Sequence, residues 1–134
     1  MSNQASIAST IGKTLYQVSI QTPSGNTLLA DEPLDKGGQN TGFSPTELLA
    51  ASLAACTSAT LRMYADRKGW DLQEVKTEIS LETDETTNHT HIDRKLRLIG
   101  NLDAEQRERL LYIANKCPVH KILSGPIEIS TGLQ

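Results

Sequence analysis

The sequence predicts an α+β fold in which antiparallel strands pack with a long central helix. Apolar and polar residues alternate along several segments, and this is the period of half-buried strands. Residues 48–61 form a run of fourteen residues without a charge, which is typical of a helix in a protein core. The strands come in pairs separated by turns, without the strand–helix–strand rhythm of a wound parallel sheet. The pattern therefore favours antiparallel hairpins and helices.

Length and charge limit the classes of protein to which the chain can belong. Its 134 residues predict a single domain over 1–134, with a polar and frayed start over 1–12. Sixteen acidic and thirteen basic residues give a net charge of −3, which argues against a nucleic-acid partner or an anionic membrane. The start lacks the basic and apolar stretches of a signal peptide, and the uncharged run is short for a bilayer span. We therefore expect a cytoplasmic protein that is not attached to a membrane.

The first predicted element is a hairpin. Apolar residues alternate with polar ones over 13–21, turn residues fill 22–26, and 27–30 reads as the returning strand. Residues 31–41 have no apolar period and include a pair of glycines, so they predict a loop in which backbone segments can approach closely.

A long helix is predicted next. Ser44 can cap it, Pro45 suits its first position, and Glu47 completes a capping box. The helix is expected to run to Lys68 and to stop at Gly69. Much of it is apolar or small on every face, so it has to be surrounded by other elements. A chain of this size cannot cover such a helix alone, which predicts a second subunit.

A second hairpin follows the helix. Alternation over 75–82 and over 92–98 predicts two one-sided strands, and the polar residues 84–88 predict the turn that joins them.

The C-terminal part predicts two more helices and a last strand. Asp103 caps the first of these helices, with Gln106 at the third helical position. Pro118 disfavours the helical conformation in the residue before it, so this helix is expected to end at Lys116. Pro118 can begin a short helix, and alternation over 127–129 predicts a final strand.

The chain has two cysteines, Cys56 and Cys117, and both lie in apolar helical contexts. Two thiols that meet in an intracellular protein are a candidate redox couple. The competing interpretation is that both are inert, small apolar side chains of the core, since free cysteine is among the most buried residue types.

Metal and nucleotide sites are not predicted. His89 and His91 would share one face of a strand, but a polar hairpin tip with two histidines is the simpler interpretation. Cys117 and His120 have the spacing of metal ligands without a second pair, and His120 could instead tune Cys117. The pair Gly37-Gly38 lacks the pattern of a phosphate-binding loop. We expect no bound cofactor.

The segments Ser44–Cys56 and Cys117–Leu123 together resemble the OsmC/Ohr family of thiol-dependent hydroperoxide reductases, and the element order over 13–131 is similar to that family. The resemblance implies an intertwined homodimer with active sites at the subunit interface and a role in oxidative-stress defence. It implies that Cys56 attacks an organic or inorganic hydroperoxide and becomes a sulfenic acid. It also implies that Cys117 resolves this acid as a disulfide, which an external dithiol reductant, such as a lipoyl group, then reduces.

The chain departs from the hydroperoxidases of that family at the charged residues. They have an acid directly after the helix-opening proline, paired with an arginine from the N-terminal region, whereas this chain has Thr46 and no such arginine. Glu47 lies about 180° around the helix from Cys56, so it is badly placed to replace the acid. A cation for Cys56 would have to be Lys13, Lys36 or a group of a partner subunit.

These departures leave two functions open. The cysteine pair favours a peroxidase, with Thr46, Glu47 and Lys13 as auxiliary candidates. The missing acid and arginine favour a non-catalytic relative that binds a small apolar ligand at the dimer interface.

Overall fold

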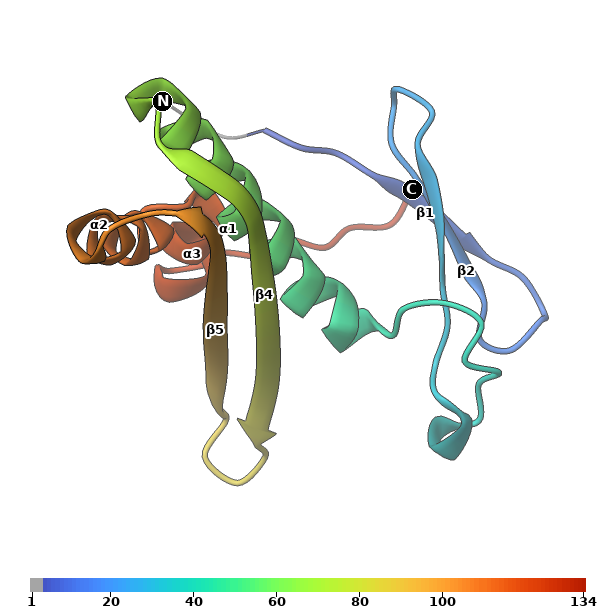
Figure 1. Cartoon of the computed structure of the whole chain (residues 1–134). Helices are drawn as coiled ribbons and strands as arrows, with labels where there is room; N and C mark the ends of the chain where they lie inside the picture. The colour runs from blue at the N-terminus through green and yellow to red at the C-terminus, as the bar shows by residue number, and fades with distance from the viewer. Residues whose placement is uncertain (1–3) are drawn as a thin grey trace. The chain divides into compact units, whose positions relative to one another are not determined.

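Figure 1 shows the computed structural model of the chain, which describes residues 4–134. The fold is α+β with antiparallel sheets and a long central helix, as predicted. The chain forms two compact units, one ending at Leu49 and the other beginning at Ala50, and each is described by itself. The prediction of a single domain over 1–134 stays a prediction. In chain order the elements are β1 (Ala8–Ile11), β2 (Val18–Gln21), β3 (Thr27–Ala30), η1 (Leu34–Lys36), α1 (Pro45–Lys68), β4 (Asp71–Asp84), β5 (His89–Asn101), α2 (Ala104–Ala114) and α3 (Pro118–Ser124).

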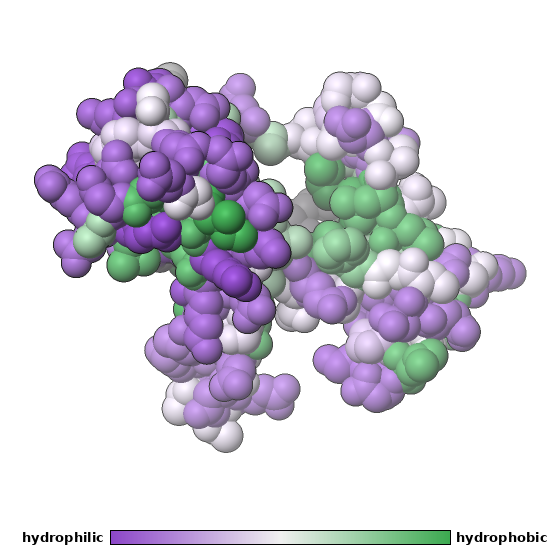
Figure 2. Space-filling view, viewed as in Figure 1, coloured by the Kyte–Doolittle hydropathy of each residue, from purple (hydrophilic) through white to green (hydrophobic). Residues whose placement is uncertain are grey.

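The N-terminal unit contains an antiparallel sheet in the order β1-β2-β3. Residues 8–11 were expected to fray, but they form β1 and pair with β2, while residues 1–3 lie outside the described residues. All four side chains of β1 are exposed, so the strand has no apolar alternation by which it could be predicted. Its stability comes from backbone pairing with β2. Apolar surface gathers on this part of the molecule in Figure 2. The side chains of Leu28, Leu29 and Phe43 are exposed.

The loop after β3 is organised around a buried carboxylate. Asp31 is only 2% exposed and accepts a hydrogen bond of 2.7 Å from the hydroxyl of Thr41 and others from the backbone N–H groups of Tyr16, Gln39 and Thr41. The Thr41 hydroxyl and these N–H groups lower the pKa of Asp31 to about 2. The close approach expected at the glycines occurs inside this loop, because a Cβ on Gly38 would overlap the carbonyl of Glu32.

The helix α1 has the predicted bounds and the predicted cap. The Ser44 N–H donates to Oε1 of Glu47 at 2.8 Å, and the Glu47 N–H donates to the Ser44 hydroxyl at 3.2 Å. The helix ends before Gly69, whose φ of 69° is easily adopted only by glycine.

Within the described residues, α1 buries a single face, formed by Leu53, Thr57, Leu61 and Ala65 at intervals of four. Its small side chains on the other faces are partly or fully exposed in the chain. By length and composition alone α1 could also cross a membrane, a test that the core helix of a soluble protein equally passes. The expected cover from a second subunit stays a prediction.

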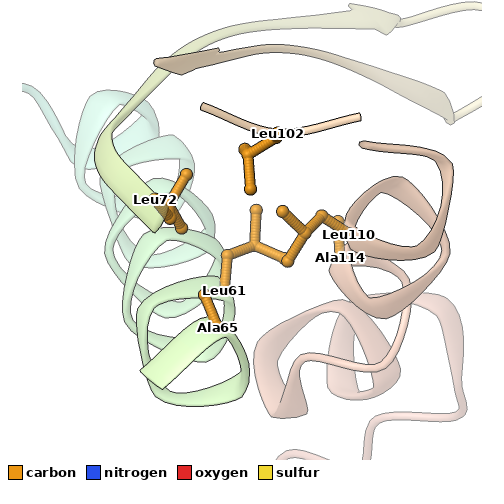
Figure 3. Close-up of a cluster of buried hydrophobic side chains, with 6 residues drawn as sticks. All are labelled: Leu61, Ala65, Leu72, Leu102, Leu110 and Ala114. Atoms are coloured by element: carbon orange, nitrogen blue, oxygen red, sulfur yellow. The ribbon is translucent and has the colours of Figure 1, made fainter. Parts of the chain in front are cut away.

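The core of the C-terminal unit forms where α1, the hairpin and α2 meet. The strands β4 and β5 pair antiparallel along their whole length, with one irregularity between Leu72 and Glu74. Figure 3 shows the cluster of buried side chains that joins these elements: Leu61, Ala65, Leu72, Leu102, Leu110 and Ala114. These residues pack α1 against the start of β4, the segment after β5 and α2.

The C-terminal elements agree with the prediction except at the end. Asp103 and Gln106 form the expected capping box at α2, which ends at Ala114, two residues before the expected Lys116. Pro118 opens α3 as predicted. The predicted last strand is wrong, since residues 125–134 contain no strand. Alternation over 127–129 is not enough for a strand, because a strand also requires a partner for its backbone groups.

Candidate functional site

Cys117 lies at the junction between α2 and α3. Because Pro118 follows it, its backbone is extended, with φ −66° and ψ 142°, and it becomes the residue that caps α3. The backbone N–H of His120 donates to its Sγ at 3.3 Å. The side chain is completely buried and the thiol is free. The local sequence therefore fixes a thiol in one position at the start of a helix.

Thr57 of α1 lies against this thiol. Its Oγ1 is 3.9 Å from Sγ of Cys117, and its hydroxyl donates to the carbonyl of Leu53 at 2.7 Å. Because the hydroxyl proton is directed to Leu53, the Cys117 S–H is the donor in the contact with Thr57.

Arg94 joins β5 to the residues around Cys117. Its Nη1 donates to Oγ1 of Thr57 at 3.0 Å. Its Nη2 lies 2.9 Å from Oδ1 of Asn115 and 3.2 Å from Nδ1 of His120. All three partners are neutral, and within residues 4–134 Arg94 forms no ion pair with a carboxylate. A positive charge is thus held next to the buried thiol.

The tautomer of His120 follows from this contact. A guanidinium can only donate, so Nδ1 of His120 accepts and the proton of the neutral ring lies on Nε2. Burial and the nearby charge of Arg94 both lower the pKa of His120 below its ordinary value. The neutral ring is therefore the form that the folded chain favours.

A pocket of about 290 Å³ opens beside Arg94 and His120. It lies between α1, β5 and α3, and its lining combines apolar and polar groups. The lining residues are Leu53, Thr90, Ile92, Arg94, His120, Leu123 and Ser124.

Cys56 is half-buried on α1, directly before Thr57, and its thiol is free. Cys117 contacts Thr57, the residue next to Cys56. The Cα atoms of neighbouring residues are about 3.8 Å apart. The two sulfurs are not bonded to each other in this structure. That Cys56 and Cys117 form a couple stays a prediction.

The auxiliary candidates lie in the N-terminal unit. Glu47 is engaged in the cap with Ser44, and that hydrogen bond lowers the pKa of its carboxyl. Thr46, Lys13 and Lys36 have exposed side chains. Their role as auxiliary groups of the site stays a prediction.

The two histidines of the hairpin are not part of a cluster of metal ligands among the described residues. His89 and His91 are both exposed at the start of β5. Within the part of the chain that the structure describes, no three His, Cys, Asp or Glu side chains come together as metal ligands.

Sequence reasoning missed Arg94, although the sequence contains a signal for it. The inward face of β5 carries Ile92, Leu96 and Leu98, and position 94 continues that alternation. An arginine at an inward position of a one-sided strand has to find buried partners, which Thr57 provides here. Lys13 and Lys36, the cations of this chain expected from the sequence, lie in the N-terminal unit instead.

The sequence is similar to one protein family and to a relative of known name. A family model described as OsmC-like protein matches residues 38–132. The organic hydroperoxide resistance protein OhrB of Bacillus subtilis (strain 168) is 30% identical over 102 residues, which are 74% of each chain. The crystal structure of the B. subtilis OhrB matches with a TM-score of 0.63 and 26% identity, over 92% of both chains.

Other solved structures share the fold at lower identity. An OsmC-like protein of Mycoplasma pneumoniae has a TM-score of 0.78 and 17% identity, covering 93% of this chain and 90% of its own. An osmotic stress induced and detoxification response protein of Psychrobacter arcticus 273-4 has a TM-score of 0.77 and 24% identity, covering 91% and 90%. At these identities the likeness shows the fold alone.

Proposed function

Because this chain belongs to the OsmC-like family, we propose that it reduces hydroperoxides with Cys56 as the attacking thiol and Cys117 as the resolving thiol. One observation carries the proposal. Buried Cys117 contacts Thr57, the neighbour of Cys56, while both thiols are free. The hydroperoxide resistance of the B. subtilis relative supports the choice of substrate.

The first step takes place at Cys56. Its thiolate attacks the distal oxygen of a hydroperoxide, the O–O bond breaks, and the alkoxide leaves with a proton as an alcohol. The sulfur is oxidised to a sulfenic acid and the peroxide is reduced. Cys56 suits this step better than Cys117, because it is half-buried whereas Cys117 is closed off from solvent.

The second step takes place at Cys117. Its thiol attacks the sulfenic sulfur of Cys56, a disulfide forms, and the hydroxyl leaves as water. A disulfide requires Cα atoms within about 7 Å of each other. Cys117 contacts Thr57, the residue next to Cys56, and we propose that the two thiols come within this distance. Burial of Cys117 protects it from direct oxidation, which suits a thiol that reacts only with its neighbour.

We propose Arg94 as the cation beside Cys117. The guanidinium bonds Thr57 and His120, which in turn contact Sγ of Cys117. A fixed positive charge stabilises negative charge that develops on sulfur during attack or departure of a thiolate. Arg94 acts through Thr57 and His120, so we assign it a positioning role.

The cycle closes with an external dithiol. Two thiols of the reductant transfer two electrons to the Cys56–Cys117 disulfide and become a disulfide themselves. We further propose a homodimer, because the small and apolar faces of α1 beyond its buried face are partly exposed in the single chain.

Turnover of an organic hydroperoxide tests this function. With a dithiol present, we expect wild type to consume cumene hydroperoxide, Cys56→Ser to consume it at the background rate, and Cys117→Ser to accumulate sulfenic acid at Cys56. Consumption that is unchanged in Cys56→Ser would contradict the proposal.

The pocket beside Arg94 supports a second candidate function, the binding of a small ligand without turnover. In that case both cysteine variants would behave as wild type in the peroxide assay.

A further inference from the structure

Arg94 carries a positive charge beside the pocket. It lies on the inward face of β5, partly buried, and its hydrogen-bond partners are a hydroxyl, an amide oxygen and a neutral imidazole. A partly buried charge without a counter-charge is costly. The structure thus holds a cation in a place that favours an anion.

The guanidinium of Arg94 has five N–H groups. Within residues 4–134, three of them donate to Thr57, Asn115 and His120, and Arg94 also lines the pocket. Its other two N–H groups are the donors that we assign to a ligand. His120 also lines the pocket, and because its Nδ1 accepts from Arg94, its Nε2–H is a further donor that we assign to the ligand.

The remaining lining of the pocket is largely apolar. Leu53 of α1, Ile92 of β5 and Leu123 of α3 contribute aliphatic side chains. The volume of about 290 Å³ is slightly below the range of about 300 to 1,000 Å³ that is usual for ligand pockets. The pocket therefore suits a short chain with one polar end.

We infer that this pocket binds a small organic carboxylate, with the carboxylate at Arg94 and His120 and the aliphatic chain against Leu53, Ile92 and Leu123. A carboxylate, with one charge and two oxygens, fits the few free donors better than a phosphate group does. Binding needs neither a peroxide group nor a thiol, so the inference goes beyond the proposed function and can fail or succeed without it.

Octanoate is the probe that tests the site. Backbone amide chemical shifts of the reduced protein are followed by NMR during titration with octanoate, and in parallel with octan-1-ol. We expect saturable shifts at α3 with octanoate and at least tenfold weaker binding of the alcohol, because a charge-assisted hydrogen bond is lost. Equal binding of the two compounds, or no binding of octanoate, would overturn the inference.

Two variants and a control locate the site. Arg94→Gln should weaken octanoate binding at least tenfold. Arg97→Gln changes an exposed arginine of the same strand and should leave binding unchanged. If Arg94→Gln does not fold, Leu123→Trp tests the assignment instead, because the tryptophan fills the pocket and the charge of Arg94 is kept. Octanoate that binds Leu123→Trp as tightly as wild type lies elsewhere, and the assignment is then wrong.

Discussion

At the scale of single residues, the site depends on one hydroxyl. Thr57 donates to Leu53, accepts from Arg94 and contacts Cys117, so it connects the helix of one cysteine with the sulfur of the other. The residue before it, Cys56, carries the proposed chemistry. The side chain of Thr57 therefore contributes to the stability of the fold and also to the surroundings of the Cys117 thiol.

Replacing Thr57 with valine keeps the shape and removes the hydroxyl. We predict a loss of about 1–3 kcal/mol in the free energy of unfolding, because Arg94 loses a buried acceptor. Sulfenic acid formation at Cys56 should persist, whereas formation of the Cys56–Cys117 disulfide should slow. Stopped-flow kinetics with a thiol probe measures both steps. Thr60→Val on the same helix is the matched control, and equal effects of the two variants would contradict the assigned role.

His120 makes stability depend on pH. Its pKa in the folded chain is lowered, while in the unfolded chain it is close to the ordinary value of about 6.5. Below about pH 6.5 the unfolded state binds more protons at this residue than the folded state does, so stability falls as pH falls towards the folded pKa. Urea unfolding between pH 7.5 and 5.5, a range around that ordinary value, should show a weaker pH dependence in His120→Gln than in wild type. His89→Gln, an exposed site, should show the wild-type slope.

At the scale of elements, the core cluster holds α1, β4 and α2 in place. Each element contributes residues at its own period, every fourth position in α1 and alternate positions in the hairpin. The site lies on the same elements, because Thr57 belongs to the buried face of α1 and Arg94 to the inward face of β5.

Neighbouring leucines of α2 test this account of the core. Leu110 is completely buried in the cluster, whereas Leu111 is 59% exposed. Leu110→Ala should lower the free energy of unfolding by about 2–5 kcal/mol, through lost burial and a cavity. Leu111→Ala should cost less than about 1 kcal/mol. Equal losses in chemical denaturation would mean that α2 packs differently.

Local signals explain which parts of the fold could be predicted. The bounds of α1 follow from its capping box and from Gly69, and the long hairpin follows from its alternation. β1 could not be predicted, because its exposed side chains have no pattern. The contact of Arg94 with Thr57 joins residues 37 positions apart, and only the packing of β5 on α1 creates it.

At the scale of the whole molecule, exposed apolar surface indicates a partner. Large apolar side chains on the sheet of the N-terminal unit are exposed (Figure 2), and so is Met63 on α1. Contiguous apolar patches of this kind are typical of subunit interfaces.

We predict an obligate homodimer. Sedimentation at micromolar concentration should give twice the chain mass of 14.6 kDa. Unfolding should depend on protein concentration, as it does when folding and assembly are coupled. Met63→Asp would place a charge on the exposed apolar face of α1 and should shift the protein towards smaller or unfolded species. A stable wild-type monomer would contradict this prediction.

The central claim is that Cys56 and Cys117 are partners in one redox cycle. The most direct measurement is mass mapping under non-reducing conditions after treatment with one equivalent of hydroperoxide. The account predicts an intramolecular Cys56–Cys117 disulfide in wild type and a sulfenic acid at Cys56 in Cys117→Ser. Recovery of two free thiols in wild type, or of overoxidised Cys56 beside an unchanged Cys117, would contradict it.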